Sequence, residues 1–214
     1  MSVFSKGITW VFNPLSMPIY ALLLVMYVPS DHQFFEPYCI YLIPQESKIA
    51  ILKMFIFFGV AAPGTVFYWM YKNKMITSIE MNTQKERRIP IVFMFIFCSI
   101  LYLLLLYFSG KSSILPRYIF SLPLAGAIVS VVFFFLNNWK KVSLHAASAG
   151  ILVGFILAFV LHHSHFQMWI LAITFLISGA VMSMRVYQKK HNLNEVIIGW
   201  VLGTFITFVT VFYY

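Results

Sequence analysis

Charged residues are scarce in this chain of 214 residues. Asp, Glu, Lys and Arg together make up 10% of it, whereas soluble domains carry about 25% charged residues. Hydrophobic residues make up 61% of the chain, which is more than one globular core of this size can hide from water. Lipid must solvate the remainder. The lack of charge therefore excludes a separate soluble domain and predicts one integral membrane domain over residues 1–214.

Cysteine is equally rare. The two cysteines, Cys39 and Cys98, form neither a CxxC motif nor a zinc-ligand spacing. Their placement argues against a disulfide framework and against a structural metal. We accordingly expect no metal and no cofactor.

Acidic residues number only six against 15 Lys and Arg, which gives a formal charge of +9. A basic excess can indicate nucleic-acid binding, but the chain lacks a basic patch, interleaved with aromatic residues, that is long enough to follow a polynucleotide. In an apolar chain, basic residues usually flank membrane helices and face anionic headgroups. The expected partners are therefore membrane lipids and not nucleic acid.

Long apolar runs are what the chain does contain. A helix needs roughly 20 apolar residues to cross a bilayer, and helices satisfy their own backbone hydrogen bonds segment by segment inside lipid. The sequence predicts an all-α, polytopic transmembrane helical bundle of about seven helices, over residues 8–28, 49–71, 90–108, 117–136, 144–162, 166–184 and 195–213. Pro14 and Pro18 interrupt the first run, which is interpreted as an uncleaved first helix that could be kinked or re-entrant.

Basic residues are distributed unevenly between the two sets of loops. If all seven segments cross, one side receives the N-terminus and the loops 72–89, 137–143 and 185–194. That side carries eleven of the 15 basic residues, namely Lys6, Lys72, Lys74, Lys85, Arg87, Arg88, Lys140, Lys141, Arg185, Lys189 and Lys190. The positive-inside rule makes this side cytoplasmic, and the membrane is expected to be a bacterial inner membrane.

The segment 183–195 combines residues suited to phosphate chemistry. His191 and Glu195 are four residues apart, so they could touch on one helix face. A carboxylate beside an imidazole fixes its tautomer and supports its cationic form, as a histidine nucleophile or base requires. Arg185 brings a planar fork that suits phosphate. The alternative is a basic loop at the membrane edge with an exposed histidine.

Two further segments lie on the same predicted side. In 140–150, Ser143 and His145 open an apolar helix, where a histidine could protonate a leaving group or simply be an interfacial residue. In 80–90, three basic residues, Lys85, Arg87 and Arg88, precede a span and could be a phosphate clamp or a topology anchor. We expect 80–90, 140–147 and 183–195 to meet at one membrane face, where ionisable clusters are functional candidates.

Taken in order, these segments resemble the type-2 phosphatidate phosphatase superfamily over roughly residues 80–205. Its third signature, Ser-Arg-x5-His-x3-Asp, is matched by Arg185 and His191, with Glu195 at the aspartate position. Its second, Pro-Ser-Gly-His, is matched by Ser143 and His145. Val142 and Leu144 replace the proline and the glycine of that signature. In the first, Lys-x6-Arg-Pro, Arg88 is shifted by one residue and Met81 stands where the lysine would be.

The resemblance implies a metal-free lipid phosphatase with a six-helix phosphatase-like core. His191 would attack phosphorus, Glu195 would orient it, and His145 would protonate the leaving oxygen and later activate water. Phosphate oxygens would be held by a set of five residues, Arg185, Arg88, Arg87, Lys85 and Ser143. The substrate would be a lipid phosphate or lipid diphosphate. The alternative is a relative without turnover that binds or transports a phosphate-bearing lipid.

A second histidine group, His162, His163 and His165, falls on the opposite predicted side. Metal binding is one interpretation, because imidazole is a common ligand. A polar loop between two spans is the preferred one, since no carboxylate or cysteine adjoins these histidines.

Overall fold

The computed structural model describes residues 3–30, 40–81, 83–112, 115–163 and 166–214, and Cys39 and His165 lie outside them. The described residues are helical and contain no strand, which confirms the all-α prediction. The helices are α1 (Val3–Val11), α2 (Met17–Tyr27), α3 (Gln45–Ile56), α4 (Ala62–Lys72), α5 (Gln84–Ser112), α6 (Arg117–Leu136), α7 (Leu144–His162), α8 (Met168–Tyr187) and α9 (Leu193–Tyr213), with a short 3-10 helix η1 (Ile40–Leu42).

Six helices in the described part of the chain are long and apolar enough to cross a membrane. The first of them runs without interruption from Gln45 to Lys72, because the π-helical turn η2 (Phe57–Ala61) joins α3 to α4. Pro63 lies in the first turn of α4, directly after the π-helical turn. The other five are α5 to α9. The protein is therefore an integral membrane protein built from a bundle of transmembrane helices.

The first apolar segment is not one continuous helix. It consists of α1 and α2, separated by a turn in which the Asn13 side chain accepts hydrogen bonds from the backbone of Leu15 and Ser16. Pro18 sits in the first turn of α2, where proline favours a helix start. The prolines thus divide this segment, and α2, with 11 residues, is shorter than a full span. The prediction of a single helix over 8–28 is wrong on this point.

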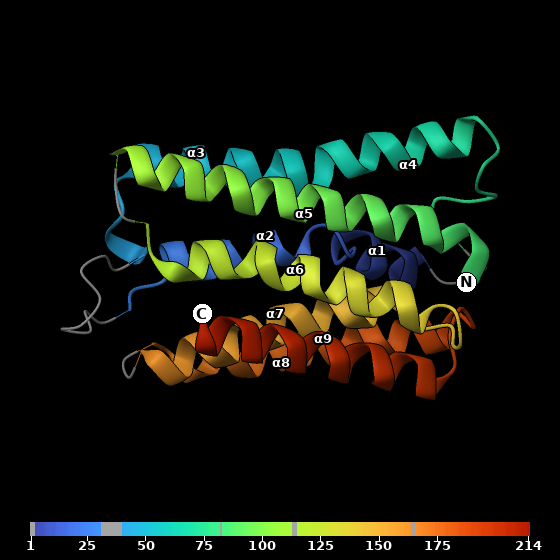
Figure 1. The fold of residues 1–214 in the computed structure, drawn as a ribbon. Coiled ribbons are helices and arrows are strands. Elements are labelled where there is room, and N and C mark those ends of the chain that lie inside the picture. The colour runs from blue at the N-terminus through green and yellow to red at the C-terminus, as the bar shows by residue number, and fades with distance from the viewer. Residues whose placement is uncertain (1–2, 31–39, 82, 113–114, 164–165) are drawn as a thin grey trace.

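α1 and α2 nevertheless carry the chain from one end of the bundle to the other. Tyr27, at the end of α2, accepts a hydrogen bond from Gln45 at the start of α3. The α2 side chains Met17, Ala21, Leu22, Val25 and Met26 are fully buried, and α2 packs against α7. The N-terminus, the α4–α5 loop, the α6–α7 loop and the α8–α9 loop all lie at one end (Figure 1). The predicted convergence of the three segments is thereby confirmed.

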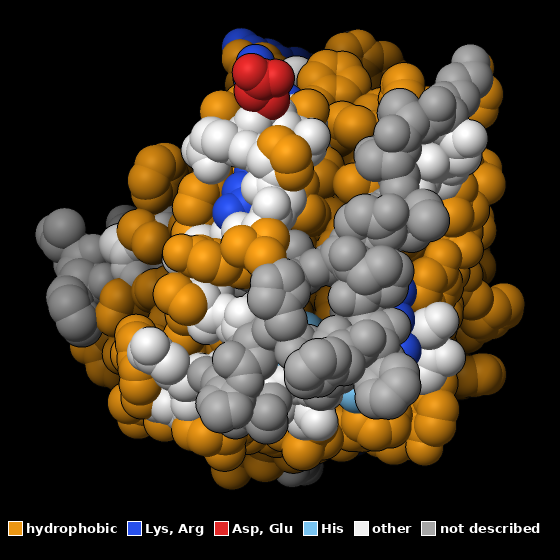
Figure 2. Space-filling model, turned by 90° about the vertical axis from the view of Figure 1, so that its left-hand side faces the viewer, with side chains coloured by type: hydrophobic (Ala, Val, Ile, Leu, Met, Phe, Trp, Pro, Cys, Tyr) orange, Lys and Arg blue, Asp and Glu red, His pale blue; other side chains and the backbone are white. Residues whose placement is uncertain are grey.

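The opposite end of the bundle contains two residues of the second histidine group. Figure 2 views the molecule from that end, where hydrophobic side chains dominate and Lys and Arg side chains are scattered. His162 and His163 lie there, in contact with aromatic rings. The His162 ring stacks on Phe212, and the His163 ring stacks on Phe159. These contacts fit packing histidines at a helix end.

α7 and α9 approach each other so closely that glycine is required on both. A Cβ atom built on Gly203 would lie 2.2 Å from the backbone oxygen of Ala147, and one on Gly154 would lie 2.3 Å from that of Thr204. Gly150 and Gly199 show similar clashes. Both helices therefore carry a Gly-xxx-Gly pair, a common device for close helix packing in membranes. This glycine seam fixes the start of α7 beside the start of α9.

Candidate functional site

The start of α9 holds His191 and Glu195 in contact. Asn192 caps the helix by accepting a hydrogen bond from the backbone N–H of Glu195, and its side-chain amide donates one to Oε1 of Glu195. The other carboxylate oxygen, Oε2, lies 2.6 Å from Nδ1 of His191, whose side chain is only 2% exposed. The predicted pair is thus formed, and the cap holds the glutamate in place for it.

Arg87 faces the other nitrogen of the His191 ring. Its Nη2 lies 3.4 Å from Nε2 of His191, while its Nη1 and Nε donate to the backbone oxygens of Val142 and Met81 at 2.6 and 2.8 Å. A guanidinium has donors only, so Nε2 must present its lone pair to it. The proton of neutral His191 is consequently on Nδ1, where it is donated to Glu195.

The surroundings keep His191 uncharged at neutral pH. Burial lowers the pKa of His191 from 6.5 to about 4, although the Glu195 hydrogen bond acts in the opposite direction. The positive charges of Arg87, Lys141 and Arg185 lower it further. The pKa of Lys141 is itself lowered, first by burial and next by Arg87. His191 is therefore a neutral imidazole whose Nε2 lone pair faces Arg87, so a bound ligand reaches this lone pair only by taking the place of that contact.

Arg185 lies at the end of α8 and is 3% exposed. Its Nη1 donates to Oε1 of Gln188 at 3.2 Å, and its Nη2 lies 3.7 Å from Oε2 of Glu80. The same Glu80 oxygen lies 3.2 Å from Nζ of Lys190. The Nε of Arg185 is buried and makes no hydrogen bond within the described residues. Arg185 itself lines the cavity.

His145 approaches the cavity from the first turn of α7 and lines it together with Arg87, Arg185 and His191. Its ring makes a hydrogen bond with the backbone of Thr9 in α1. Thr9 also accepts a hydrogen bond from the Gln188 side chain. The N-terminal helix thereby links the first turn of α7 to the end of α8.

Three of the predicted phosphate ligands lie elsewhere. Arg88 is exposed and donates to Oδ1 of Asn138 at 2.7 Å, and Lys85 is exposed outside the cavity lining. Successive helix residues point about 100° apart, so Arg87 and Arg88 cannot face the same cavity. The Ser143 hydroxyl is the N-cap of α7, accepting from the backbone of Ala146. Of the five predicted phosphate ligands, only Arg87 and Arg185 line the cavity, and Ser143 caps a helix instead.

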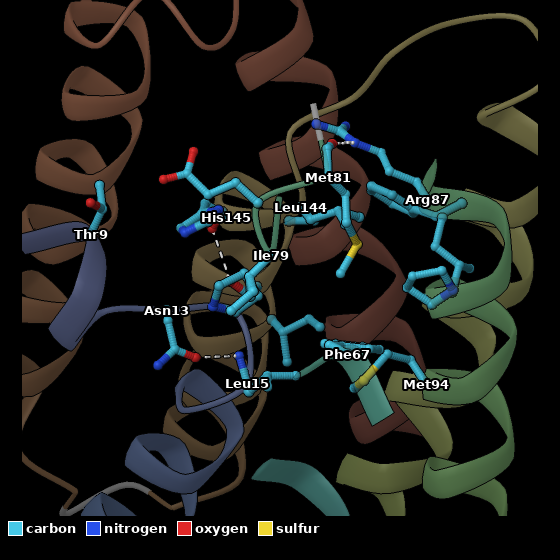
Figure 3. A pocket seen from close by; sticks show the side chains of 18 of the residues that line it. Thr9, Asn13, Leu15, Phe67, Ile79, Met81, Arg87, Met94, Leu144 and His145 are labelled. Carbon is cyan, nitrogen blue, oxygen red and sulfur yellow. Dashed lines mark hydrogen bonds between the residues drawn. The ribbon is translucent and has the colours of Figure 1, made fainter. Parts of the chain in front are cut away.

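The cavity itself has a volume of about 940 Å³ and extends from these groups into the bundle. Its charged end contains Glu80, Arg87, Arg185, Lys190 and His191. The remainder is mostly apolar. Figure 3 shows His145 and Arg87 in the upper part of the cavity, with Leu15, Phe67 and Met94 below them. A cavity of this kind matches a ligand with an anionic head and a hydrocarbon tail.

Several residues of the site were not predicted from the sequence. Glu80 and Gln188 fall inside segments that the sequence singles out, but nothing in their spacing indicates contacts with Arg185 or Thr9. The basic side chains Lys141 and Lys190 were interpreted only as topology signals. Their contribution to the site depends on loop geometry, which places Nζ of Lys141 3.1 Å from the backbone oxygen of Lys190.

No protein-family model, curated protein or solved structure matches the chain. The chemistry of the site must therefore be inferred from its own geometry.

Proposed function

We propose that the protein is a membrane phosphatase that hydrolyses a lipid phosphate or lipid diphosphate through a phosphohistidine intermediate. The observation that carries the proposal is the state of His191. Its Nδ1–H is held by Glu195 and its Nε2 lone pair faces the guanidinium of Arg87, inside a cavity that His145 and Arg185 also line. A nucleophile oriented by a carboxylate and set beside cationic donors is an arrangement suited to phosphoryl transfer.

In the first step, Nε2 of His191 attacks phosphorus. The N–P bond forms as the bond between phosphorus and the leaving oxygen breaks, and that oxygen takes its proton from His145, which must enter this step as the imidazolium. Glu195, hydrogen-bonded to Nδ1–H, stabilises the positive charge that the phosphorylated ring acquires. Arg87 and Arg185 neutralise the charge on the remaining phosphate oxygens.

In the second step, His145 takes a proton from a water molecule whose oxygen attacks phosphorus. The N–P bond breaks, inorganic phosphate leaves, and His191 returns to its neutral form with its proton on Nδ1. For a lipid diphosphate the leaving group is the lipid monophosphate, and the proton balance is unchanged. No step requires a metal ion.

Charge balance at the site also favours an anionic substrate. Four cationic side chains, Arg87, Lys141, Arg185 and Lys190, surround two carboxylates, Glu80 and Glu195. The surplus of positive charge can be neutralised by a phosphate head. Glutamate in place of the family's aspartate does not weaken the arrangement, because its longer side chain still reaches Nδ1 of His191.

The second candidate is a phosphate-headgroup binder or transporter that has lost turnover. Leu144 favours it, because this side chain lines the cavity beside His145 where the resemblance would place a glycine. Met81 favours it too, since it supplies a backbone carbonyl to Arg87 where the family has a lysine.

Purified protein in detergent, given lipid phosphates in the presence of EDTA, decides between the two. We expect phosphate release from the wild type and none from His191→Ala. His162→Ala, at the opposite end of the bundle, is the matched control and should retain the rate. Equal rates in both variants, or release that requires an added divalent cation, would contradict the phosphohistidine mechanism. Binding without release would favour the second candidate.

The active site is proposed to face the cytoplasm of a bacterial inner membrane. This rests on the charge distribution, since the end of the bundle with the site carries most of the basic residues. The phosphate-binding cations contribute to that count, but Lys72, Lys74, Lys140 and Lys189 lie at the same end without lining the cavity.

A further inference from the structure

The cavity continues well beyond its charged end as an apolar arm. On α5, cavity-lining residues recur at Arg87, Ile91, Met94 and Cys98, which is one face of the helix. Eleven residues separate Arg87 from Cys98, so the arm is about 16 Å deep at the usual rise of 1.5 Å per residue. It therefore runs from the charged end toward the middle of the predicted bilayer.

The arm ends where α5 meets α6. Cys98 and Gly126 both line it, and a Cβ atom built on Gly126 would lie 3.0 Å from Sγ of Cys98. A side chain added at position 126 would either displace the Cys98 side chain or fill the end of the arm. One turn further along α6, Ser130 returns its hydroxyl to the backbone oxygen of Gly126, so it presents no free polar group to the arm. Gly126 and Cys98 form an apolar floor.

We propose that this arm binds the tail of a single-chain lipid phosphate and that Gly126 and Cys98 set the longest tail that fits. The inference rests on the proposed function, whose phosphate site forms the mouth of the arm. A carbon–carbon bond measures about 1.5 Å and the chain zigzags, so a depth of about 16 Å holds roughly a dozen carbons.

The size of the cavity is sufficient for a phosphate head and one tail. Pockets for single drug-sized ligands measure about 300–1,000 Å³, and the whole cavity, including its charged end, is about 940 Å³. The orientation is also consistent, since a lipid held in this way keeps its head at the membrane edge and its tail at hydrocarbon depth.

Chain-length dependence of turnover is the first test. With alkyl phosphates of four to sixteen carbons, kcat/KM of the wild type should rise about fourfold per buried methylene and level off near twelve carbons. Gly126→Leu should lower kcat/KM for the twelve-carbon substrate by about tenfold or more and change the four-carbon value by less than about twofold. Gly179→Leu on α8, where an added Cβ atom would meet nothing within 4 Å, is the matched control and should behave like the wild type.

A second test is independent of turnover and of the Gly126 variant. In a Cys39→Ser background, the rate at which N-ethylmaleimide modifies Cys98 reports occupancy of the floor. Dodecyl phosphate should slow the modification at least about tenfold, whereas butyl phosphate and inorganic phosphate should not. Such protection without phosphate release would refute the phosphatase and leave the tail site standing.

Other results would overturn the tail site while leaving the phosphatase intact. One such result is phosphate release combined with a Cys98 that is equally reactive in the presence of all ligands. Stronger protection by a two-chain lipid phosphate than by dodecyl phosphate would overturn the single-chain assignment.

Discussion

Replacing Arg87 with alanine separates the proposed site from the alternatives more sharply than any other single change. Arg87 donates to the backbone oxygens of Met81 and Val142 and faces Nε2 of His191. Its neighbour Arg88 is exposed and makes one hydrogen bond, to Asn138. The two arginines are adjacent in sequence and identical in chemistry, so Arg88→Ala is a matched control for Arg87→Ala.

The expected loss follows from the contacts. A hydrogen bond to a charged group contributes about 1.5–3 kcal/mol, and each 1.36 kcal/mol is a factor of ten in rate, so removing one phosphate ligand lowers kcat/KM by roughly 10- to 150-fold. Arg88→Ala should change kcat/KM by less than about twofold. Arg87→Ala also leaves two buried carbonyls without their donor, at a cost of about 1–3 kcal/mol each in unfolding free energy.

A pH profile distinguishes a missing ligand from a loosened fold. His191 acts as a neutral nucleophile, so activity is lost as the pH falls through its pKa. Arg87 is one of the cations that lower this pKa, hence Arg87→Ala should raise it and move the acid limb of the profile upward from about pH 4 toward 6.5. Initial rates between pH 3.5 and 8 in EDTA, with thermal unfolding of each variant, provide the measurement. A larger loss in Arg88→Ala than in Arg87→Ala would refute the assignment.

Three further outcomes are expected. In the wild type, the acid limb of kcat/KM that reports His191 should be centred near pH 4, because burial lowers the pKa of His191; a limb centred on 6.5 would show that the histidine is exposed to water. Glu195→Gln should reduce kcat about 10- to 100-fold without a matching rise in KM, since the amide can still accept from Nδ1–H but cannot balance the charge of the phosphorylated ring; an unchanged kcat would exclude an orienting role for the carboxylate. In a background lacking both native cysteines, Asn73→Cys and Lys189→Cys should resist a membrane-impermeant thiol reagent in intact cells while Glu46→Cys reacts, and the reverse pattern would place the site outside the cell.

Sequence reasoning located the spans well because a run of apolar residues is a local property. The loop positions followed from counting, which is why the three functional segments were assigned to the same end. The first segment was harder, since Pro14 and Pro18 are compatible with a kink as well as with a break. The Asn13 turn that decides between them depends on side-chain hydrogen bonds.

The site was predictable where its residues are close in the sequence. His191 and Glu195 are four apart and do meet, although His191 lies just before the N-cap Asn192 and not within α9. The choice between Arg87 and Arg88 depends on the rotation of α5 about its axis, and the preceding loop decides it by supplying the Met81 carbonyl. The salt bridge of Glu80 with Arg185 joins residues 105 positions apart, which no single-sequence pattern encodes.

Because of the glycine seam between α7 and α9, substitutions should have very different effects at different positions of the protein. Leu103, Phe205 and Leu176 are more than half exposed, and one apolar residue can replace another there at little cost. Along the seam, the smallest possible addition, a methyl group at Gly203 or Gly154, collides with backbone atoms of the facing helix and must change the spacing between His145 and His191. Substitutions at these glycines are therefore expected to disturb the arrangement at the starts of α7 and α9 far more than substitutions at the exposed apolar positions.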